Sequence, residues 1–286
     1  MTDKYSSEPA QKVDVKAVFY SKNSRLAKLL PGFIFRYLKR IVHEDDINAF
    51  LEKHGQKLDL EFIDAAIEDF SVTLETYGEE NIPRNDKLIF AANHPLGGFD
   101  GIILMKIISR HFDSFRFLVN DILMNISNIR GLFIPINKHG SLALQAARLI
   151  DDTFRSDTQI LTFPAGLVSR RIKGKITDLT WKKSFITKAV EFKRNVIPVH
   201  FSGGNSNFFY NFSNIRTRLG IKANIEMLYL ANETYKHRNK KLVVKFGKPI
   251  SYQTFDRSKK PIEWAQWVKE KVYELDAGVM KQPETV

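Results

Sequence analysis

Short apolar runs alternate with helical patterns from Lys87 onward, and this alternation restricts the fold more than any other feature of the sequence. The apolar runs that we predict to be strands are residues 88–92, 115–119, 132–136, 160–163, 196–201 and 242–246. Helical patterns predict helices over residues 101–110, 141–154, 179–194 and 261–275. Strands separated by helical crossovers form a mostly parallel or mixed sheet that helices cover on both faces. We therefore predict an α/β fold, and in such sheets ligands bind where strands end.

The first 80 residues lack this alternation and are typical of helices instead. We predict helices over residues 44–53 and 59–77, the second with Asp59 as its N-cap and an apolar stripe at helical spacing. A chain of 286 residues builds one sizeable core, and a second independent domain is not expected. We therefore divide the chain into an N-terminal helical segment over residues 1–80 and one compact α/β domain over residues 81–286.

Residues 24–42 form an amphipathic pattern within the N-terminal segment. Large apolar side chains recur near helical spacing at Leu26, Leu30, Phe33, Tyr37 and Ile41. Basic side chains lie elsewhere around the same helix at Arg25, Lys28, Arg36, Lys39 and Arg40. This pattern is typical of a membrane-associating helix, in which each basic residue near anionic headgroups adds about 1 kcal/mol of binding. It also fits a helix packed on the domain with a solvated basic face, and in either case we expect Pro31 and Gly32 to split it.

The charge balance indicates an anionic partner but does not identify which kind. Lys and Arg number 44 against 32 Asp and Glu, which gives a net charge of +12. Nucleic acid, an anionic membrane surface and an acidic carrier protein all fit this charge. The absence of cysteine excludes disulfides, thiolate nucleophiles and Cys-ligated metal sites. No apolar run approaches the ~20 residues of a spanning helix and the N-terminus is polar, so we expect a soluble or peripheral intracellular protein.

Polar, glycine-containing loops follow several of the predicted strands directly. These loops contain Asn93, His94 and Asp100 after the first strand, residues 137–140 after the third, residues 164–171 after the fourth, and residues 202–204 after the fifth. Because the carboxyl ends of parallel strands meet at one edge of a sheet, we expect these loops to converge on one site.

The first of these loops contains a histidine and an aspartate that fit acid–base chemistry. His94 is the side chain of this loop that accepts a proton near neutral pH, and Asp100 can bind its other ring nitrogen, fixing the tautomer and stabilising the imidazolium. Pro95, Gly97 and Gly98 allow a sharp turn before the next helix, whose N-terminal amides favour an anion. The alternative is that His94 only ends a strand and Asp100 only caps the helix.

Other catalytic templates are missing from the sequence. It contains no G-x-S-x-G nucleophile elbow, and neither G-x-G-x-x-G nor the Walker pattern occurs. The seven histidines include no H-E-x-x-H spacing, so we expect no metal.

The motifs, taken together, resemble those of a known enzyme family. The residues that carry the resemblance are Asn93, His94 and Asp100, residues 131–137, Phe163, Pro164, Ala165 and Gly166 with Arg170, residues 196–199, and the tail over residues 245–250. Their order and approximate spacing are similar to the four motifs of the lysophospholipid (1-acylglycerol-3-phosphate type) acyltransferases. The resemblance extends from Leu88 to about Val199, and the histidine–aspartate pair together with a Phe-Pro-x-Gly loop makes it fairly specific.

This resemblance implies direct acyl transfer from a thioester to a lipid hydroxyl without an acyl-enzyme intermediate. His94 would be the general base, Asp100 would hold its ring, and backbone amides or a nearby lysine would stabilise the oxyanion. The implied acceptor-binding residues are Asn137, Lys138, Phe163, Pro164, Ala165, Gly166, Arg170 and Arg171, with Asn93, Gly97 and Gly98 in support. Either arginine would hold an anionic headgroup through paired hydrogen bonds, although residues 170–175 also fit a solvated basic loop. No bound cofactor is implied, and the co-substrate would be acyl-ACP or acyl-CoA.

The sequence departs from the family pattern in three places. Five residues separate His94 from Asp100 where four are usual, Ala165 replaces a Glu, and Asn137 replaces an Arg. The last two changes lie where an acceptor phosphate would be held, and the motif looks closest to the branch that makes amino-acid-containing lipids. We therefore expect the acceptor to be an N-(3-hydroxyacyl) amino acid, acylated on its 3-hydroxyl at the cytoplasmic face of the membrane.

Other functions stay open at this point. One alternative is a 1-acylglycerol-3-phosphate O-acyltransferase of phospholipid synthesis. A protein that binds lipid or nucleic acid without catalysis is another, because aromatic residues such as the cluster over residues 208–212 can stack on bases, line an acyl groove or dock on a membrane. We expect no nucleic-acid partner, since many aromatic residues lie in apolar patterns that predict burial.

Overall fold

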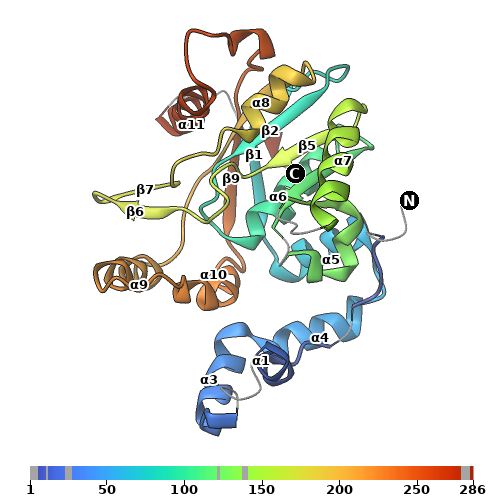
Figure 1. The fold of residues 1–286 in the computed structure, drawn as a ribbon. Helices are drawn as coiled ribbons and strands as arrows, with labels where there is room; N and C mark the ends of the chain where they lie inside the picture. The colour runs from blue at the N-terminus through green and yellow to red at the C-terminus, as the bar shows by residue number, and fades with distance from the viewer. Residues whose placement is uncertain are drawn as a thin grey trace.

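A computed structural model of the chain describes residues 6–10, 12–22, 28–120, 123–136, 141–277 and 284–285. Its centre is an eight-stranded sheet in the order β10-β1-β9-β8-β2-β5-β3-β4, and β6 and β7 form a separate two-stranded hairpin (Figure 1). The strands are β1 (Thr73–Tyr77), β2 (Leu88–Ala92), β3 (Phe115–Val119), β4 (Phe133–Pro135), β5 (Gln159–Thr162), β6 (Arg170–Ile172), β7 (Lys175–Thr177), β8 (Asn195–Phe201), β9 (Lys241–Phe246) and β10 (Glu284–Thr285).

The directions of the strands confirm the predicted mixed, mostly parallel sheet. β2 runs parallel to β5 and β8, and β3 runs parallel to β4 and β5. The direction reverses between β8 and β9, which pair antiparallel, while β1 runs parallel to β9. The carboxyl ends of β2, β3, β4, β5 and β8 therefore lie at the same edge of the sheet, where the predicted loops begin.

Helices cover the sheet on both faces, as the apolar runs of its central strands require. The helices are α1 (Val15–Lys22), α3 (Gly32–Val42), α4 (Glu44–His54), α5 (Asp59–Phe70), α6 (Gly98–Ile108), α7 (Ser141–Arg155), α8 (Ser184–Glu191), α9 (Asn207–Arg218), α10 (Leu230–Tyr235) and α11 (Pro261–Ala277). In β2, Leu88 and Phe90 join the core beneath α5 and α6, whereas Ile89 and Ala91 join the core beneath α8 and α11. This burial on both faces explains why the central strands are apolar at every position.

Most predicted elements are confirmed with small shifts. β2 and β3 have the predicted bounds, and β4, β5, β8 and β9 lie within one residue of theirs at each end. The helix predicted over residues 179–194 is wrong in its first part, because α8 begins only at Ser184. The Trp181 side chain is fully buried and the backbone N–H of Lys182 donates to Pro164 O. This stretch therefore packs against the loop that contains Pro164 and does not form a helix.

The helix predicted over residues 59–77 is also wrong in its second half. α5 ends at Phe70, and Ser71 follows with a positive φ of 49°. The next residues form β1, which adds to the sheet beside β9, with Leu74 and Thr76 as its buried positions. Residues 73–77 thus lie in the sheet, on the N-terminal side of the division that we placed at residue 80.

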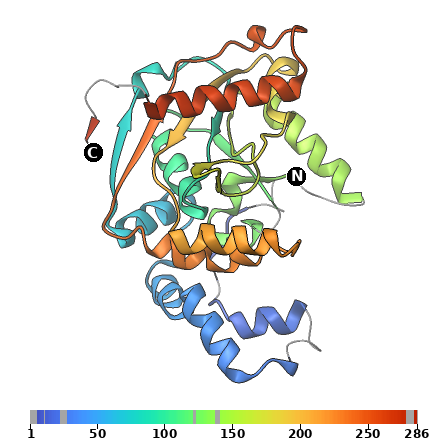
Figure 2. The ribbon, with the colours of Figure 1, turned by 90° about the vertical axis from the view of Figure 1, so that its left-hand side faces the viewer.

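The N-terminal helices α1, α3 and α4 lie at one end of the molecule (Figures 1 and 2). The helical pattern breaks before Pro31 as predicted, and α3 begins at Gly32. The helices attach to the segment from η5 (Ile225–Tyr229) to α10, where the hydroxyls of Tyr37 and Tyr229 are 2.6 Å apart and the His43 ring stacks on Tyr235 at 4.0 Å. Arg25 and Leu26 of the amphipathic pattern lie outside the described residues.

Candidate active site

The loops that follow β2, β5 and β8 meet at the shared edge of the sheet. Asn93 joins the ends of β2 and β8, because its amide donates to Phe201 O (2.9 Å) and accepts from Phe201 N (2.7 Å). The His94 ring stacks on Phe163, which follows β5, with ring centres 4.0 Å apart and planes 14° from parallel. The predicted convergence is confirmed for these three loops, and the fourth, over residues 137–140, lies outside the described residues.

His94 and Asp100 form a hydrogen-bonded pair within this site. His94 Nδ1 lies 2.8 Å from Asp100 Oδ2, and the Leu96 N–H donates to both carboxylate oxygens, at 3.1 and 3.0 Å. Asp100 is fully buried, and this burial raises its pKa above the ordinary value, although the hydrogen bonds from His94 and Leu96 oppose the shift. Since an ionised carboxylate only accepts, Nδ1 carries the proton and Nε2 is the ring nitrogen able to take another.

The turn between the two residues accommodates the longer spacing. Gly97 has a φ of +82°, a conformation that residues with a Cβ rarely adopt, and a Cβ there would approach Leu230 Cδ2 to 3.3 Å. α6 begins directly afterwards at Gly98, so Asp100 lies in its first turn with its carboxylate toward the His94 ring. The five intervening residues are thus absorbed by a glycine turn and the start of a helix.

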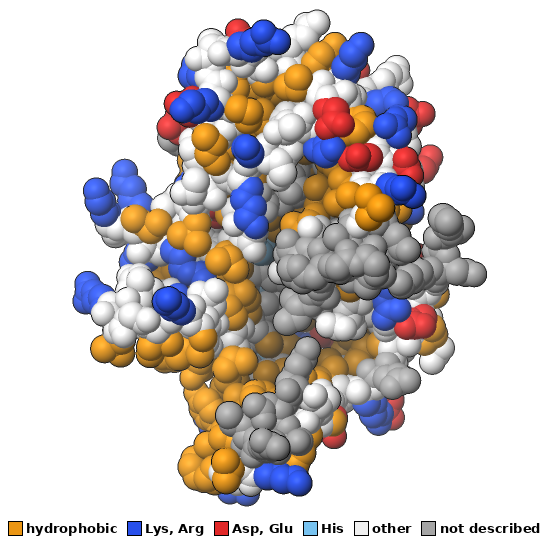
Figure 3. Space-filling model, in the orientation of Figure 1, with side chains coloured by type: hydrophobic (Ala, Val, Ile, Leu, Met, Phe, Trp, Pro, Cys, Tyr) orange, Lys and Arg blue, Asp and Glu red, His pale blue; other side chains and the backbone are white. Residues whose placement is uncertain are grey.

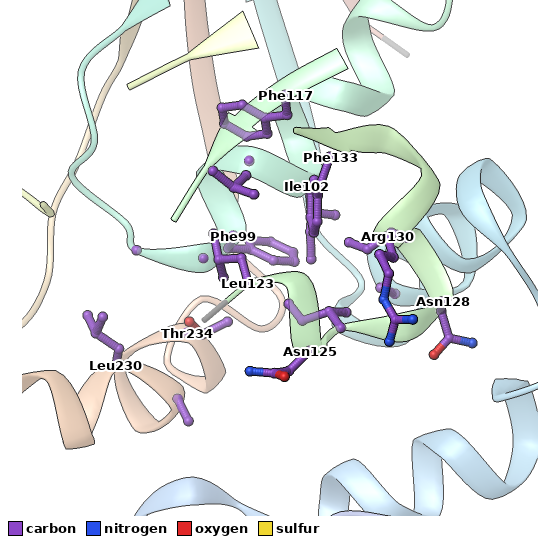
Figure 4. A pocket seen from close by; sticks show the side chains of 18 of the residues that line it. Phe99, Ile102, Phe117, Leu123, Asn125, Asn128, Arg130, Phe133, Leu230 and Thr234 are labelled. Atoms are coloured by element: carbon purple, nitrogen blue, oxygen red, sulfur yellow. The ribbon is translucent and has the colours of Figure 1, made fainter. Parts of the chain in front are cut away.

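A large, mostly apolar cavity of about 1140 Å³ opens beside the pair. His94, Gly97 and Gly98 line it together with Phe163 and Gly166. Figure 4 shows Phe99, Phe117 and Phe133 gathered in one part of it, and the polar side chains of Asn125, Asn128 and Arg130 in another. The cavity therefore joins a proton-accepting nitrogen to a space that suits a hydrocarbon chain.

The structure separates the predicted acceptor-binding residues into two groups. Phe163 and Gly166 line the cavity, whereas Ala165 is buried in the core beneath α8 and α11. Pro164 is buried as well, and its carbonyl accepts from Lys182 N at 3.0 Å. Asn137 and Lys138 lie outside the described residues.

Arg170 and Arg171 do not line the cavity, since both guanidinium groups bind other parts of the protein. Arg170 is buried, and its Nη2 lies 2.9 Å from Glu226 Oε1. Burial lowers the pKa of Arg170, and the Glu226 carboxylate opposes that shift. Arg171 donates to Asn207 Oδ1 at 2.5 Å and lies over the Tyr210 ring.

Comparison with known proteins identifies the family. An acyltransferase family model matches residues 17–280. The chain belongs to this acyltransferase family. Two relatives, from Bacteroides thetaiotaomicron and Phocaeicola vulgatus, are each named lyso-glycine lipid O-acyltransferase and are 48% and 47% identical over 264 residues. These alignments cover 92% of this chain and 97% and 95% of the relatives. The family resemblance predicted from the motifs is confirmed, and the protein is an acyltransferase.

A solved structure also matches the acyltransferase. It is the 1-acyl-sn-glycerophosphate (LPA) acyltransferase PlsC from Thermotoga maritima, with 20% identity and a TM-score of 0.46. The match covers 87% of this chain and 95% of the other.

Asp178 supports the site of the acyltransferase, although no sequence pattern indicated it. This carboxylate is buried, and its Oδ1 accepts from His94 N (3.2 Å) and Ser169 Oγ (2.5 Å). Its Oδ2 accepts from Trp181 Nε1 at 2.8 Å. Asp178 thus ties the histidine loop to the segment after β7, a contact between positions 84 residues apart that no local pattern shows.

Among the residues that the structure describes, no group of three or more His, Cys, Asp or Glu side chains is arranged to hold a metal ion. Within the same described ranges, no helix has the length and apolar character needed to cross a membrane.

Proposed function

We propose that this acyltransferase moves an acyl group from a thioester to the 3-hydroxyl of an N-(3-hydroxyacyl) amino acid, with glycine as the preferred headgroup. The observation that carries the proposal is the His94–Asp100 pair at the apolar cavity. The names of the two relatives, each about half identical over nearly the whole chain, support the acceptor. The lysophosphatidic acid alternative keeps the same chemistry and differs in the headgroup and in the position of the accepting hydroxyl, which is on glycerol and not on the acyl chain.

The ring geometry supports a role for His94 as the general base. Nε2 removes the proton of the acceptor hydroxyl while its oxygen attacks the thioester carbonyl carbon. The new C–O bond gives a tetrahedral intermediate, which collapses when the C–S bond breaks. The imidazolium then returns its proton to the departing thiolate, so the products are an ester and a free thiol. Asp100 stabilises the imidazolium between these two transfers through its hydrogen bond to Nδ1.

The cavity supports a lipid acceptor or donor chain. Its lining includes side chains from α6, β3, β4 and α10, among them Phe99, Phe117, Phe133 and Leu230. Moving one methylene group from water into such a space stabilises the complex by about 0.8 kcal/mol, so a long acyl chain supplies much of the binding energy. Selection of the headgroup then depends on the polar residues near His94.

We also propose that the protein works as a peripheral protein on an anionic membrane, at its cytoplasmic face. Large apolar side chains are exposed along the N-terminal helices and the α9–η5 segment, at Leu29, Phe33, Phe208, Ile215, Leu219 and Leu228. Figure 3 shows hydrophobic side chains gathered on the lower part of the face that it presents. Phe35, Leu38 and Ile41 form the buried side of α3, which leaves Phe33 62% exposed. The exposed Arg36 and Arg40 lie on the same helix and suit anionic headgroups.

The first experiment measures label transfer from acyl-ACP and from acyl-CoA to a panel of acceptors. The panel contains N-(3-hydroxyacyl)glycine, its serine and ornithine relatives, and lysophosphatidic acid, with wild type and His94→Ala in parallel. Product from an amino-acid acceptor that is lost in His94→Ala supports the proposal. Product from lysophosphatidic acid alone overturns the acceptor and keeps the chemistry, and no product from any acceptor overturns both.

A further inference from the structure

A lysine outside the recognised motifs lies beside the loop that carries Phe163. A Cβ placed on Gly166 would come within 3.1 Å of Lys182 Nζ and 3.6 Å of its Cε, which locates the ammonium group next to this glycine. Gly166 has a φ of +70°, so a side chain is disfavoured there on backbone grounds as well. Lys182 and Gly166 both line the cavity.

Lys182 differs from the other basic residues around the cavity because it has no acidic partner. Arg130 lies 2.8 Å from Glu8, and Lys12 lies 3.7 Å from Glu52. In the described part of the chain, no hydrogen-bond acceptor or carboxylate contacts Lys182 Nζ, although its backbone N–H is bonded to Pro164 O. An unpaired cation at the opening of an apolar cavity suits the charged end of an amphiphile.

The turn between Phe163 and Gly166 is comparable in length with the part of the proposed acceptor that joins its carboxylate to its hydroxyl. Residues 163–166 form a turn closed by the Gly166 N–H and Phe163 O at 2.9 Å, and such turns hold their end Cα atoms within about 7 Å. Phe163 stacks on His94 and Gly166 contacts Lys182, so the turn spans the two groups. In an extended N-(3-hydroxyacyl)glycine, the carboxylate and hydroxyl carbons are separated by less than two residue lengths, about 6 Å.

We propose that Lys182 binds the carboxylate of the acceptor headgroup while the 3-hydroxyl lies at His94 Nε2. This inference rests on the proposed function and names the specificity residue of the same site. It assigns the anion site to a lysine and not to the motif arginines, whose guanidinium groups are already bound to Glu226 and Asn207. One ammonium group balances the single negative charge of a carboxylate.

The test compares two acceptors that differ only in charge, N-(3-hydroxyacyl)glycine and its uncharged glycinamide. We expect Lys182→Gln to reduce the preference for the carboxylate acceptor, measured as the ratio of kcat/KM values, by roughly tenfold through KM. Lys182→Arg should restore most of the preference. Lys183→Gln is the matched control, because Lys183 is the exposed neighbour and does not line the cavity.

The outcomes separate this inference from the proposed function. If wild type transfers acyl groups to the glycine acceptor and Lys182→Gln keeps the wild-type preference, the inference is wrong and the proposed function stands. Equal losses on both acceptors also contradict it, because they indicate a structural or catalytic role. Wild type without activity on either acceptor overturns the proposed function and this inference with it.

Discussion

Helix α6 has a histidine–carboxylate pair near each of its ends, and the two pairs differ in what surrounds them. His94 and Asp100 are 2.8 Å apart at its start, and His111 and Glu79 are 2.5 Å apart beyond its end. Each histidine side chain is 16% exposed, so solvent access does not distinguish them. His94 lines the cavity and stacks on Phe163, whereas His111 and Glu79 do not line it and Arg110 lies 3.7 Å from the same carboxylate.

The comparison shows that a histidine–carboxylate pair does not make a site by itself. Both pairs can fix a tautomer and stabilise an imidazolium. Only the pair at the start of α6 has a free ring nitrogen beside a space in which a substrate hydroxyl can lie. An 11-residue helix is about 16 Å long, so the second pair is too far away to assist the first.

Removing each histidine in turn gives the largest expected contrast. His94→Ala should lower kcat/KM by about 10³-fold, the usual order for the loss of a general base. His111→Ala should leave kcat/KM within about twofold of wild type, because its side chain does not reach the cavity. Steady-state transfer rates for both variants, with thermal unfolding to confirm folding, measure the contrast. Comparable losses in the two variants would mean that His94 acts through the fold and not through the reaction.

Replacing each carboxylate by its amide gives the next largest contrast. Asp100→Asn should lower kcat/KM by roughly 10²-fold, less than the loss of the base itself, because an amide oxygen still accepts from Nδ1 but does not stabilise the imidazolium. The Leu96 N–H contacts both Asp100 oxygens, so the new amide N–H₂ also faces a donor. The matched variant is Glu79→Gln, for which we expect no change in the rate beyond about twofold. A full rate in Asp100→Asn would show that the charge of Asp100 is not used.

The sequence predicted the local part of this site and missed the part that long-range contacts build. His94 and Asp100 are six positions apart, so one turn of backbone brings them together. Asp178 and Lys182 reach the site from a segment more than 80 residues away, and no spacing rule connects them to His94. Arg170 was predicted from its motif to hold a headgroup, and no local pattern showed its actual partner, because Glu226 lies 56 positions further along the chain.

The fold shows the same difference, because elements with a clear local pattern were predicted and elements that depend on long-range pairing were missed. β2 and β3 were found with their bounds because buried strands are continuously apolar or alternate strongly. β1 has the same five-residue length as β2 and β3, and it was missed because it has a single large aliphatic side chain, Leu74, and takes its place in the sheet by pairing with β9. The β6–β7 hairpin offered a signal that was not used. Lys173 and Gly174 between its strands have positive φ values, and Lys-Gly at this place fits a two-residue hairpin turn.

A third histidine sharpens the comparison, because it is buried without a hydrogen-bonded carboxylate. His200 Nδ1 has no hydrogen-bond partner among the described residues and lies 3.8 Å from Asp276. Burial lowers the pKa of His200 from its ordinary 6.5 to about 4. Between these values the unfolded chain binds a proton that the folded chain does not, so stability falls as the pH falls.

The size of this effect follows from the two pKa values of His200. We expect the free energy of unfolding to drop by about 2 kcal/mol between pH 6 and pH 4.5, over and above the contribution of other groups. In His200→Phe, which keeps a ring near Tyr273, that part of the drop should disappear. Urea unfolding of both proteins at the two pH values measures the difference. An identical pH dependence in wild type and variant would show that His200 is protonated in the folded state.

The smallest expected effect belongs to the pair beyond the end of α6. His111→Gln retains a donor for Glu79, and Arg110 remains 3.7 Å from that carboxylate, so the free energy of unfolding should fall by about 1 kcal/mol or less. Activity should stay within about twofold of wild type, because neither His111 nor Glu79 lines the cavity. Urea unfolding and transfer rates on the same preparation measure the two quantities together. A tenfold loss of activity without a loss of stability would contradict the comparison itself. It would mean that α6 couples its two ends, and that the surroundings of His94 alone do not decide which pair is used in acyl transfer.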